Sequence, residues 1–270
     1  MSSLKFKSKS YTLTAGNAIR WHPGWGHFST DQSHAGLTNT EQRALDRRTE
    51  MTTVKTNFSW LKFTHQNKTW RKLESSRGVY SDGEDDIDRD LAALPSGMKY
   101  VLYFMSDGLN SYNPSETEVL PGYVHSNGVY DATFAYAPDW TVADTRSGFV
   151  DAVKHYIDRY NDDTRFEGIY LIPETALNGA SAGAITGLKA IIDALATQTN
   201  SYRKMNLWVG VNYTSGGSSA DYDLMDYARA RKFGVAGPDT FSDQNRLVQG
   251  SPYTGGDPSG PLGFRNNTTA

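Results

Sequence analysis

The chain has 270 residues, which is enough for one barrel domain or for two ordinary domains. Hydrophobic residues make up 38% and charged residues 21% of the sequence, which is typical of folded globular proteins and not of disordered chains. The net charge is −3, whereas proteins that bind polyanions normally carry an excess of basic residues on one face. No nucleic-acid partner is therefore expected. The absence of cysteine excludes disulfides, thiolate metal sites and cysteine nucleophiles.

No apolar run approaches the roughly 20 residues that a membrane-spanning helix requires, so no membrane partner is predicted. The first eleven residues are polar and basic, and no apolar segment follows them, so they do not read as a secretory signal. Two localisations therefore stay open: the protein remains in the cell that makes it, or a signal has been removed from a secreted protein.

Strand-like and helix-like segments alternate along the chain, which predicts parallel strands connected by helices. Strands are expected at 18–21, 58–63, 100–105, 168–172, 207–211 and 233–236. Helices are expected from about residue 40 and at 85–94, 147–160, 184–196 and 224–231. The loop of roughly residues 106–145 is long for a compact domain, which is typical of a functional loop. After Ser242 the periodicity ends, which predicts a barrel domain over 1–242 and a Gly/Pro/Ser/Asn-rich loop or tail over 243–270.

The predicted fold class is α/β, a (β/α)8 TIM barrel of which about six β/α units are recognisable and the last two are missing or irregular. The alternative is an open dinucleotide-binding sheet, which requires a glycine-rich phosphate turn after its first strand. The segment 21–27 contains bulky aromatic residues instead, and the chain contains no Gly-Lys-Ser/Thr sequence. Long loops after the strands, with tryptophans in them, favour the barrel.

Glu174 stands at the carboxyl end of the apolar run 166–173, and no glutamate follows it in the sequence. Barrel enzymes carry catalytic groups at the carboxyl ends of their strands, so Glu174 is a candidate proton donor. The alternative is that Pro173-Glu174-Thr175 opens the next helix, where a carboxylate is favourable.

Two segments carry a resemblance to a known group of enzymes. The first runs from Trp70 through Glu74 and Gly78-Val79-Tyr80 to Leu91, and the second covers 149–175. Both resemble the clan A retaining glycoside hydrolases, TIM-barrel glycosidases of the β-galactosidase and cellulase type, and the resemblance extends loosely over 18–240. It implies a carbohydrate substrate, with Glu174 as acid/base at the end of the fourth strand, in a member that lacks its carboxyl-terminal part. Pro173 departs from the clan, which has an asparagine there.

Glycosidic hydrolysis uses two carboxyl groups, one to protonate the leaving oxygen and one to act as nucleophile or base. In the clan the second group is a glutamate after the seventh strand, which this chain does not supply. Asp239, after the sixth expected strand, is the candidate for that role, although Gly-Pro-Asp-Thr also reads as a turn. Asp107, after the third strand, is a further acid that could face the site or serve as a cap.

Several residues are candidates for substrate contacts. Trp25 and Trp70 lie in expected loops and could stack on a sugar ring, although an ordinary core position is the alternative. His22 could line the site, and Asn212 and Tyr213 follow the fifth strand, where clan members contact substrate. The histidines are not spaced like a zinc site, and no metal or cofactor is expected.

The predicted function is the hydrolysis of O-glycosidic bonds of an oligo- or polysaccharide, with Glu174 as general acid/base. One alternative is a non-catalytic carbohydrate-binding protein on the same scaffold, in which the second carboxylate has been lost. Another is a viral or cell-surface structural protein. The sequence makes no prediction about the oligomeric state, the sugar, or retention against inversion.

Overall fold

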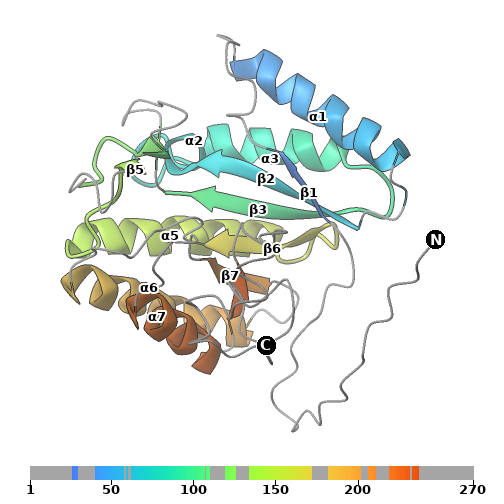
Figure 1. The fold of residues 1–270 in the computed structure, drawn as a ribbon. Helices are drawn as coiled ribbons and strands as arrows, with labels where there is room; N and C mark the ends of the chain where they lie inside the picture. The colour runs from blue at the N-terminus through green and yellow to red at the C-terminus, as the bar shows by residue number, and fades with distance from the viewer. Residues whose placement is uncertain are drawn as a thin grey trace, which may run out of the picture.

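The centre of the protein is a six-stranded sheet in which all neighbouring strands are parallel (Figure 1). The computed structural model describes residues 26–29, 40–57, 59, 62–106, 108–109, 119–125, 134–171, 182–201, 206–210, 219–231 and 233–236. The strands lie in chain order, as β1 (Gly26–Ser29), β2 (Phe63–Thr69), β3 (Lys99–Met105), β6 (Phe166–Leu171), β7 (Asn206–Gly210) and β8 (Gly234–Ala236). The predicted α/β class with a parallel sheet is therefore confirmed.

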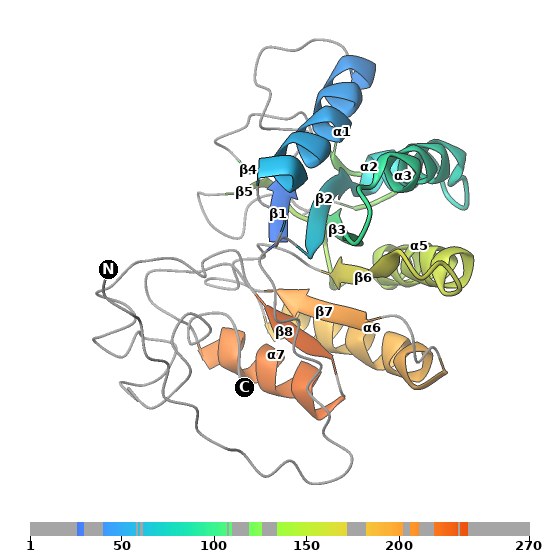
Figure 2. The same ribbon diagram turned by 90° about the vertical axis from the view of Figure 1, so that its right-hand side faces the viewer.

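The helices cover one face of this sheet. They are α1 (Thr40–Asn57), α2 (Trp70–Leu73), α3 (Ser81–Ala93), α5 (Ala143–Tyr160), α6 (Ala182–Ser201) and α7 (Ser219–Ala230). The sheet is curved, and Figure 2 shows the helices on its convex side, from α1 beside β1 to α7 beside β8. A short antiparallel pair, β4 (Gly108–Leu109) with β5 (Phe134–Tyr136), lies within the connection from β3 to α5.

The order of the strands separates two architectures. A dinucleotide-binding sheet reverses its strand order and carries helices on both faces. Here the order follows the chain and the helices lie on the convex face, which is the winding of a (β/α) barrel. In the described part of the chain β1 and β8 are the two ends of the sheet, so its closure into an eight-stranded barrel stays a prediction.

The first two strands differ from the sequence prediction. The expected first strand at 18–21 lies outside the described residues, and β1 is Gly26–Ser29. The second strand is Phe63–Thr69 and not 58–63, because its sequence, Phe-Thr-His-Gln-Asn-Lys-Thr, is polar and gives no apolar strand signal. It is defined instead by its pairing with β3, from Phe63 opposite Lys99 to Thr69 opposite Met105. The other four strands agree with the prediction to within two residues at either end.

Alternation along the strands separates the side chains into two layers. On β3, Leu102 and Phe104 belong to the large core between the sheet and the helices. Val101, Tyr103 and Met105 form a second, smaller cluster with Tyr170 of β6. This second cluster lies on the inner face of the sheet, away from the helices. The predicted tail, 243–270, lies outside the described residues.

Candidate functional site

The carboxyl ends of the six strands meet at one edge of the sheet, because all the strands are parallel. Glu174 comes three residues after the end of β6, and Asp239 comes three residues after the end of β8. A chain extends at most about 3.6 Å per residue, so each Cα is within about 11 Å of its strand end. Both residues lie outside the described part of the chain.

The remaining predicted contacts after strands have the same status. Asn212 and Tyr213 follow Gly210, the last residue of β7, and lie outside the described residues. Asp107, directly after β3, also lies outside them. Their predicted roles are untested.

His22 and Trp25 come before β1 in the sequence. They were expected in a loop after the first strand, but they precede Gly26, the first residue of β1. Both residues lie outside the described part of the chain, and their predicted contact with substrate is untested.

Trp70 is part of the core and not a sugar-stacking platform. Its side chain has no exposed surface and stacks against Trp140, with ring centroids 6.3 Å apart. Phe149 lies edge-on to the same indole, at 5.2 Å between centroids. The prediction for Trp70 is therefore corrected: the short helix α2 turns this ring into the helix-facing layer, where packing buries both of its faces.

Glu74 is the hydrogen-bonded centre of the loop after β2, and its side chain is fully buried. Its carboxylate accepts hydrogen bonds from Trp70 Nε1 at 2.8 Å, from the Gly78 amide at 2.8 Å and from the Tyr123 hydroxyl. Gly78 has a φ of +73°, a conformation that favours glycine and turns its N–H toward the carboxylate. Trp70, Glu74 and Gly78 of the quoted motif, together with Tyr123 from a later segment, thus form a unit that fixes the conformation of this loop.

This unit reaches into the long connection between β3 and α5. Burial, followed by the hydrogen bond and negative charge of Glu74, raises the pKa of Tyr123 well above its usual value. The Arg77 guanidinium lies over the Tyr123 ring, 5.1 Å from its centroid, and donates to Ser147 Oγ on α5 at 3.1 Å. Two loops at the carboxyl edge of the sheet are thereby held together. In the sequence, Glu74 belongs to the motif that resembles the glycosidase clan, but its partner Tyr123 is 49 residues away along the chain.

The inner face of the sheet carries a row of polar and aromatic residues that the sequence reasoning did not identify. Asn67 on β2 pairs in register with Tyr103 on β3, which pairs with Tyr170 on β6. The ring centroids of Tyr103 and Tyr170 are 4.9 Å apart. The His65 ring stacks on Tyr170 with a centroid separation of 6.5 Å. The two tyrosines are at alternating positions in apolar strands, which is the pattern that could have revealed them.

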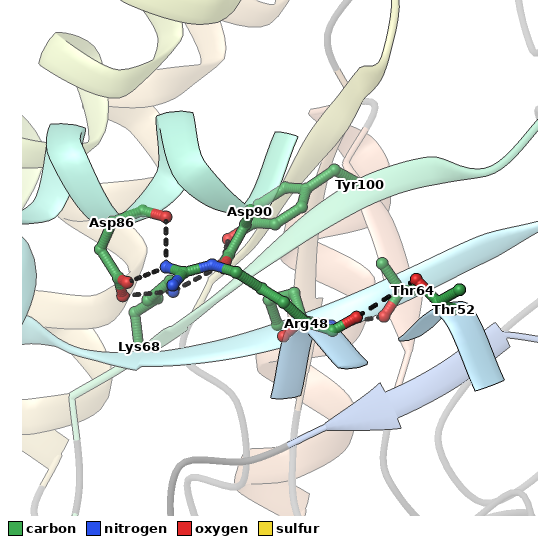
Figure 3. A network of polar contacts seen from close by, with 8 residues as sticks. Arg48, Thr52, Thr64, Lys68, Asp86, Asp90 and Tyr100 are labelled. Carbon is green, nitrogen blue, oxygen red and sulfur yellow. Dashed lines mark hydrogen bonds and ion pairs between the residues drawn. The ribbon is translucent and has the colours of Figure 1, made fainter. Parts of the chain in front are cut away.

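A cluster of charges lies on the other side of β2, where it faces the helices (Figure 3). Lys68 Nζ is 2.5 Å from Asp86 and 2.6 Å from Asp90, and Arg48 of α1 binds both carboxylates at 2.7 and 2.9 Å. The Lys68 and Asp90 side chains have no exposed surface, so these charges join α1 and α3 to β2 and are closed to a ligand.

Metal and membrane sites are not indicated by the residues that the structure describes. Among them, no three histidines or acidic residues lie close enough together to hold a metal ion. No helix in the same part of the chain is both long and apolar enough to span a bilayer. A cavity of about 310 Å³ lies where α5 begins and packs on α6, and Arg146, Thr186 and Gly187 contribute to its lining.

Comparison with known proteins gives a structural likeness only. No family model matches the chain, and no curated protein sequence matches it. The fold is similar to GH5_18 from Bifidobacterium longum subsp. longum ATCC 55813, with a TM-score of 0.48 and 16% identity over 72% of this chain and 45% of that one.

Two further solved structures show a similar degree of likeness. The exo-beta-1,4-mannosidase Op5Man5 from Opitutaceae bacterium strain TAV5 has a TM-score of 0.47 and 12% identity over 65% of this chain and 30% of that one. Endo-glycoceramidase II from Rhodococcus sp., in a cellobiose-like imidazole complex, has a TM-score of 0.47 and 12% identity over 71% of this chain and 49% of that one.

The chain spans less than half the length of these three structures. They are clan A glycoside hydrolases, the group that the sequence motifs resemble. With TM-scores below 0.5 they support no assignment for this chain.

Proposed function

We propose that this chain is a carbohydrate-active protein that hydrolyses O-glycosidic bonds, with Glu174 as general acid/base. One observation carries the proposal: β6 ends at Leu171 inside a parallel sheet, so covalent geometry keeps Glu174 within about 11 Å of the edge where all six strands end. The motifs around Trp70 and Glu174, which resemble the glycosidase clan, agree with this position.

The reaction needs a second carboxyl group on the other side of the scissile bond. Asp239 is the proposed partner, because it follows β8 at the same edge as Glu174. Only β7 lies between β6 and β8, so the two strand axes are separated by about 10 Å. Carboxyl groups about 5 Å apart give retention and those about 6.5–9.5 Å apart give inversion, and side chains converging from these strands can reach either spacing.

The substrate would lie over the inner face of the sheet. Asn67, Tyr103 and Tyr170 form its polar aromatic row, and Asn212 and Tyr213 follow β7 at the adjacent edge. Aromatic faces and hydroxyl-pairing groups suit a pyranose, which presents both C–H surfaces and hydroxyl groups. Water is the acceptor, so the proposed reaction requires no cofactor.

A non-catalytic carbohydrate-binding protein is the second candidate. One observation favours it: the described residues that end the six strands, namely Ser29, Thr69, Met105, Leu171, Gly210 and Ala236, include no carboxylate. If Asp239 does not face Glu174, the scaffold would bind sugars without cleaving them.

One experiment on the purified chain distinguishes the two candidate functions. Binding is measured by calorimetry, and cleavage by release of reducing ends, with cellotetraose, mannotetraose and lactose. The first candidate predicts cleavage that Glu174→Gln abolishes while binding remains, and that Glu167→Gln, in a strand position near the amino end of β6, leaves unchanged. Binding without cleavage in the wild-type chain supports the second candidate. Binding of none of the three sugars contradicts both.

A further inference from the structure

Asn67 carries a buried polar atom that has no hydrogen-bond partner among the residues that the structure describes. Its side chain is 6% exposed, and its Oδ1 atom is closed off from solvent and has no hydrogen bond. Leaving a buried acceptor unpaired destabilises the folded state measurably, and native proteins pair the great majority of such atoms. A residue that keeps this cost in the unliganded protein is a candidate for pairing with something outside the chain.

The position of Asn67 is on the inner face of the sheet. Residues in direct register on parallel strands point to the same face, and Asn67 is opposite Tyr103. Tyr103 belongs to the inner cluster with Tyr170 and is separate from the core that faces the helices. The unpaired oxygen therefore belongs to the face over which the proposed substrate would lie, two residues before β2 ends.

We infer that the Asn67 amide hydrogen-bonds a hydroxyl group of the bound carbohydrate and thereby selects for ligands that place a hydroxyl there. This inference rests on the proposed function. A hydroxyl both donates and accepts, so it pairs with the amide whichever way the group is turned. The oxygen is closed to solvent in the unliganded protein, so the inference requires that it becomes accessible when the ligand binds. The free-energy cost of the unpaired oxygen would then be relieved in the complex.

The preceding residue, Gln66, provides a matched control. Gln66 is also buried and has an unpaired side-chain oxygen, Oε1, while its Nε2 donates to Thr64 Oγ1 at 2.6 Å. It points to the opposite face, because it is in register with Leu102 of the helix-facing core. A substitution at Gln66 thus removes an equivalent atom from the same strand without touching the inner face.

The test uses thermal unfolding and calorimetry of the whole chain, with and without cellotetraose, mannotetraose or lactose. Without sugar, Asn67→Leu is expected to melt about 3 °C above the wild type, because an unpaired buried oxygen has been removed. With the sugar that binds the wild type, Asn67→Leu should bind about tenfold more weakly. Gln66→Leu should retain the wild-type affinity, because Gln66 faces the helices.

Three results would overturn the inference. The first is a lower melting temperature for Asn67→Leu without sugar, which would mean that a protein group or a water pairs the oxygen. The second is wild-type affinity in Asn67→Leu. If that variant does not fold, Asn67→Ala removes the same oxygen, and unchanged affinity there is equally decisive. The third is failure of the wild type to bind any of the three sugars, which contradicts the proposed function as well. In that case the melting temperatures without sugar still show whether the Asn67 oxygen is unpaired in the free protein.

Discussion

The ammonium group of Lys68 lies 2.6 Å from a carboxylate oxygen of Asp90, and neither side chain has any exposed surface. Asp86 contacts the same ammonium, Arg48 contacts both carboxylates, and the Tyr100 hydroxyl donates to Asp90 at 3.2 Å. Two positive and two negative side chains thus balance one another where an apolar core would be expected. Such a network does not stabilise the folded state more than well-packed apolar residues would. Removing one member is nevertheless strongly destabilising, because it leaves a buried charge without its partner.

Lys68→Met is expected to lower the free energy of unfolding by about 3–5 kcal/mol, because it leaves two buried carboxylates to one arginine. Urea-induced unfolding measures the change. Adding Asp90→Leu should restore part of the loss, since Arg48 and Asp86 then remain as a pair at 2.7 Å. Strictly additive effects of the two substitutions would contradict the coupling of these charges.

Glu74→Gln is expected to destabilise the protein by about 1–3 kcal/mol. The carboxylate accepts from three donors, and the amide group of glutamine would direct its own N–H groups at one of them. Tyr123→Phe removes a single donor and should cost less. Hydrogen exchange of residues 119–125 is the direct measurement, because it should accelerate in both variants. Unchanged exchange in Glu74→Gln would show that this carboxylate does not hold the loop.

Alkaline pH is expected to destabilise the region around Tyr80. Burial, followed by the nearby Glu74 charge, raises the pKa of Tyr80 to about 12, against an ordinary value of about 10. Burial also raises the pKa values of Tyr123, Tyr156 and Tyr160. The folded state thus favours the neutral phenols, so their contribution is complete below pH 10 and is lost as the pH rises from about 10 through 12.

Melting temperatures across pH 8 to pH 11.5 (roughly the window set by these pKa values) measure this loss, and the absorbance of tyrosinate follows the ionisation. Tyr80→Phe should flatten part of the decline. A melting temperature that does not change up to pH 11.5 would be incompatible with raised pKa values at these tyrosines.

Gly187→Ala is expected to be strongly destabilising. A Cβ on Gly187 would lie 2.0 Å from the carbonyl oxygen of Trp140, so α6 would have to move away from the segment before α5. Overpacking of this kind typically costs about 1–3 kcal/mol. Gly122→Ala is the control, because a Cβ there meets nothing within 4 Å and should leave the melting temperature the same or slightly higher. Equal melting temperatures for the two variants would contradict the close packing at Gly187.

Sequence reasoning was most accurate where the local pattern and the burial agreed. The apolar run of β3 and the helical spacing of α5 led to elements at nearly the observed positions. It was wrong for β2, because Thr64, Gln66 and Lys68 occupy positions that face the helices and are nevertheless polar. Lys68 forms ion pairs with α3, and Gln66 donates a hydrogen bond to Thr64 on the same strand; the ion pairs join segments that are distant in sequence, so no local pattern predicts them.

The candidate site divides in the same way. The positions of Glu174, Asn212, Tyr213 and Asp239 after strand ends follow from the alternation of elements along the chain. The burial of Trp70 and the role of Glu74 could not be predicted, because they depend on Trp140, Phe149 and Tyr123, which are 49 or more residues away along the chain.

By itself, the sequence determined the alternation of strands and helices and hence the parallel α/β class, since the periods of two and 3.6 residues are local properties of the chain. Tertiary structure decided the rest. The pairing of β2 with β3 put the second strand at Phe63–Thr69 and not at 58–63. Packing of α2 and α5 against the sheet buried Trp70 in the core between the sheet and the helices. Pairing with Tyr103 put Asn67 on the opposite, inner face of the sheet. These outcomes depend on contacts between segments that are distant in sequence, so the residues of one local segment do not determine their free energies.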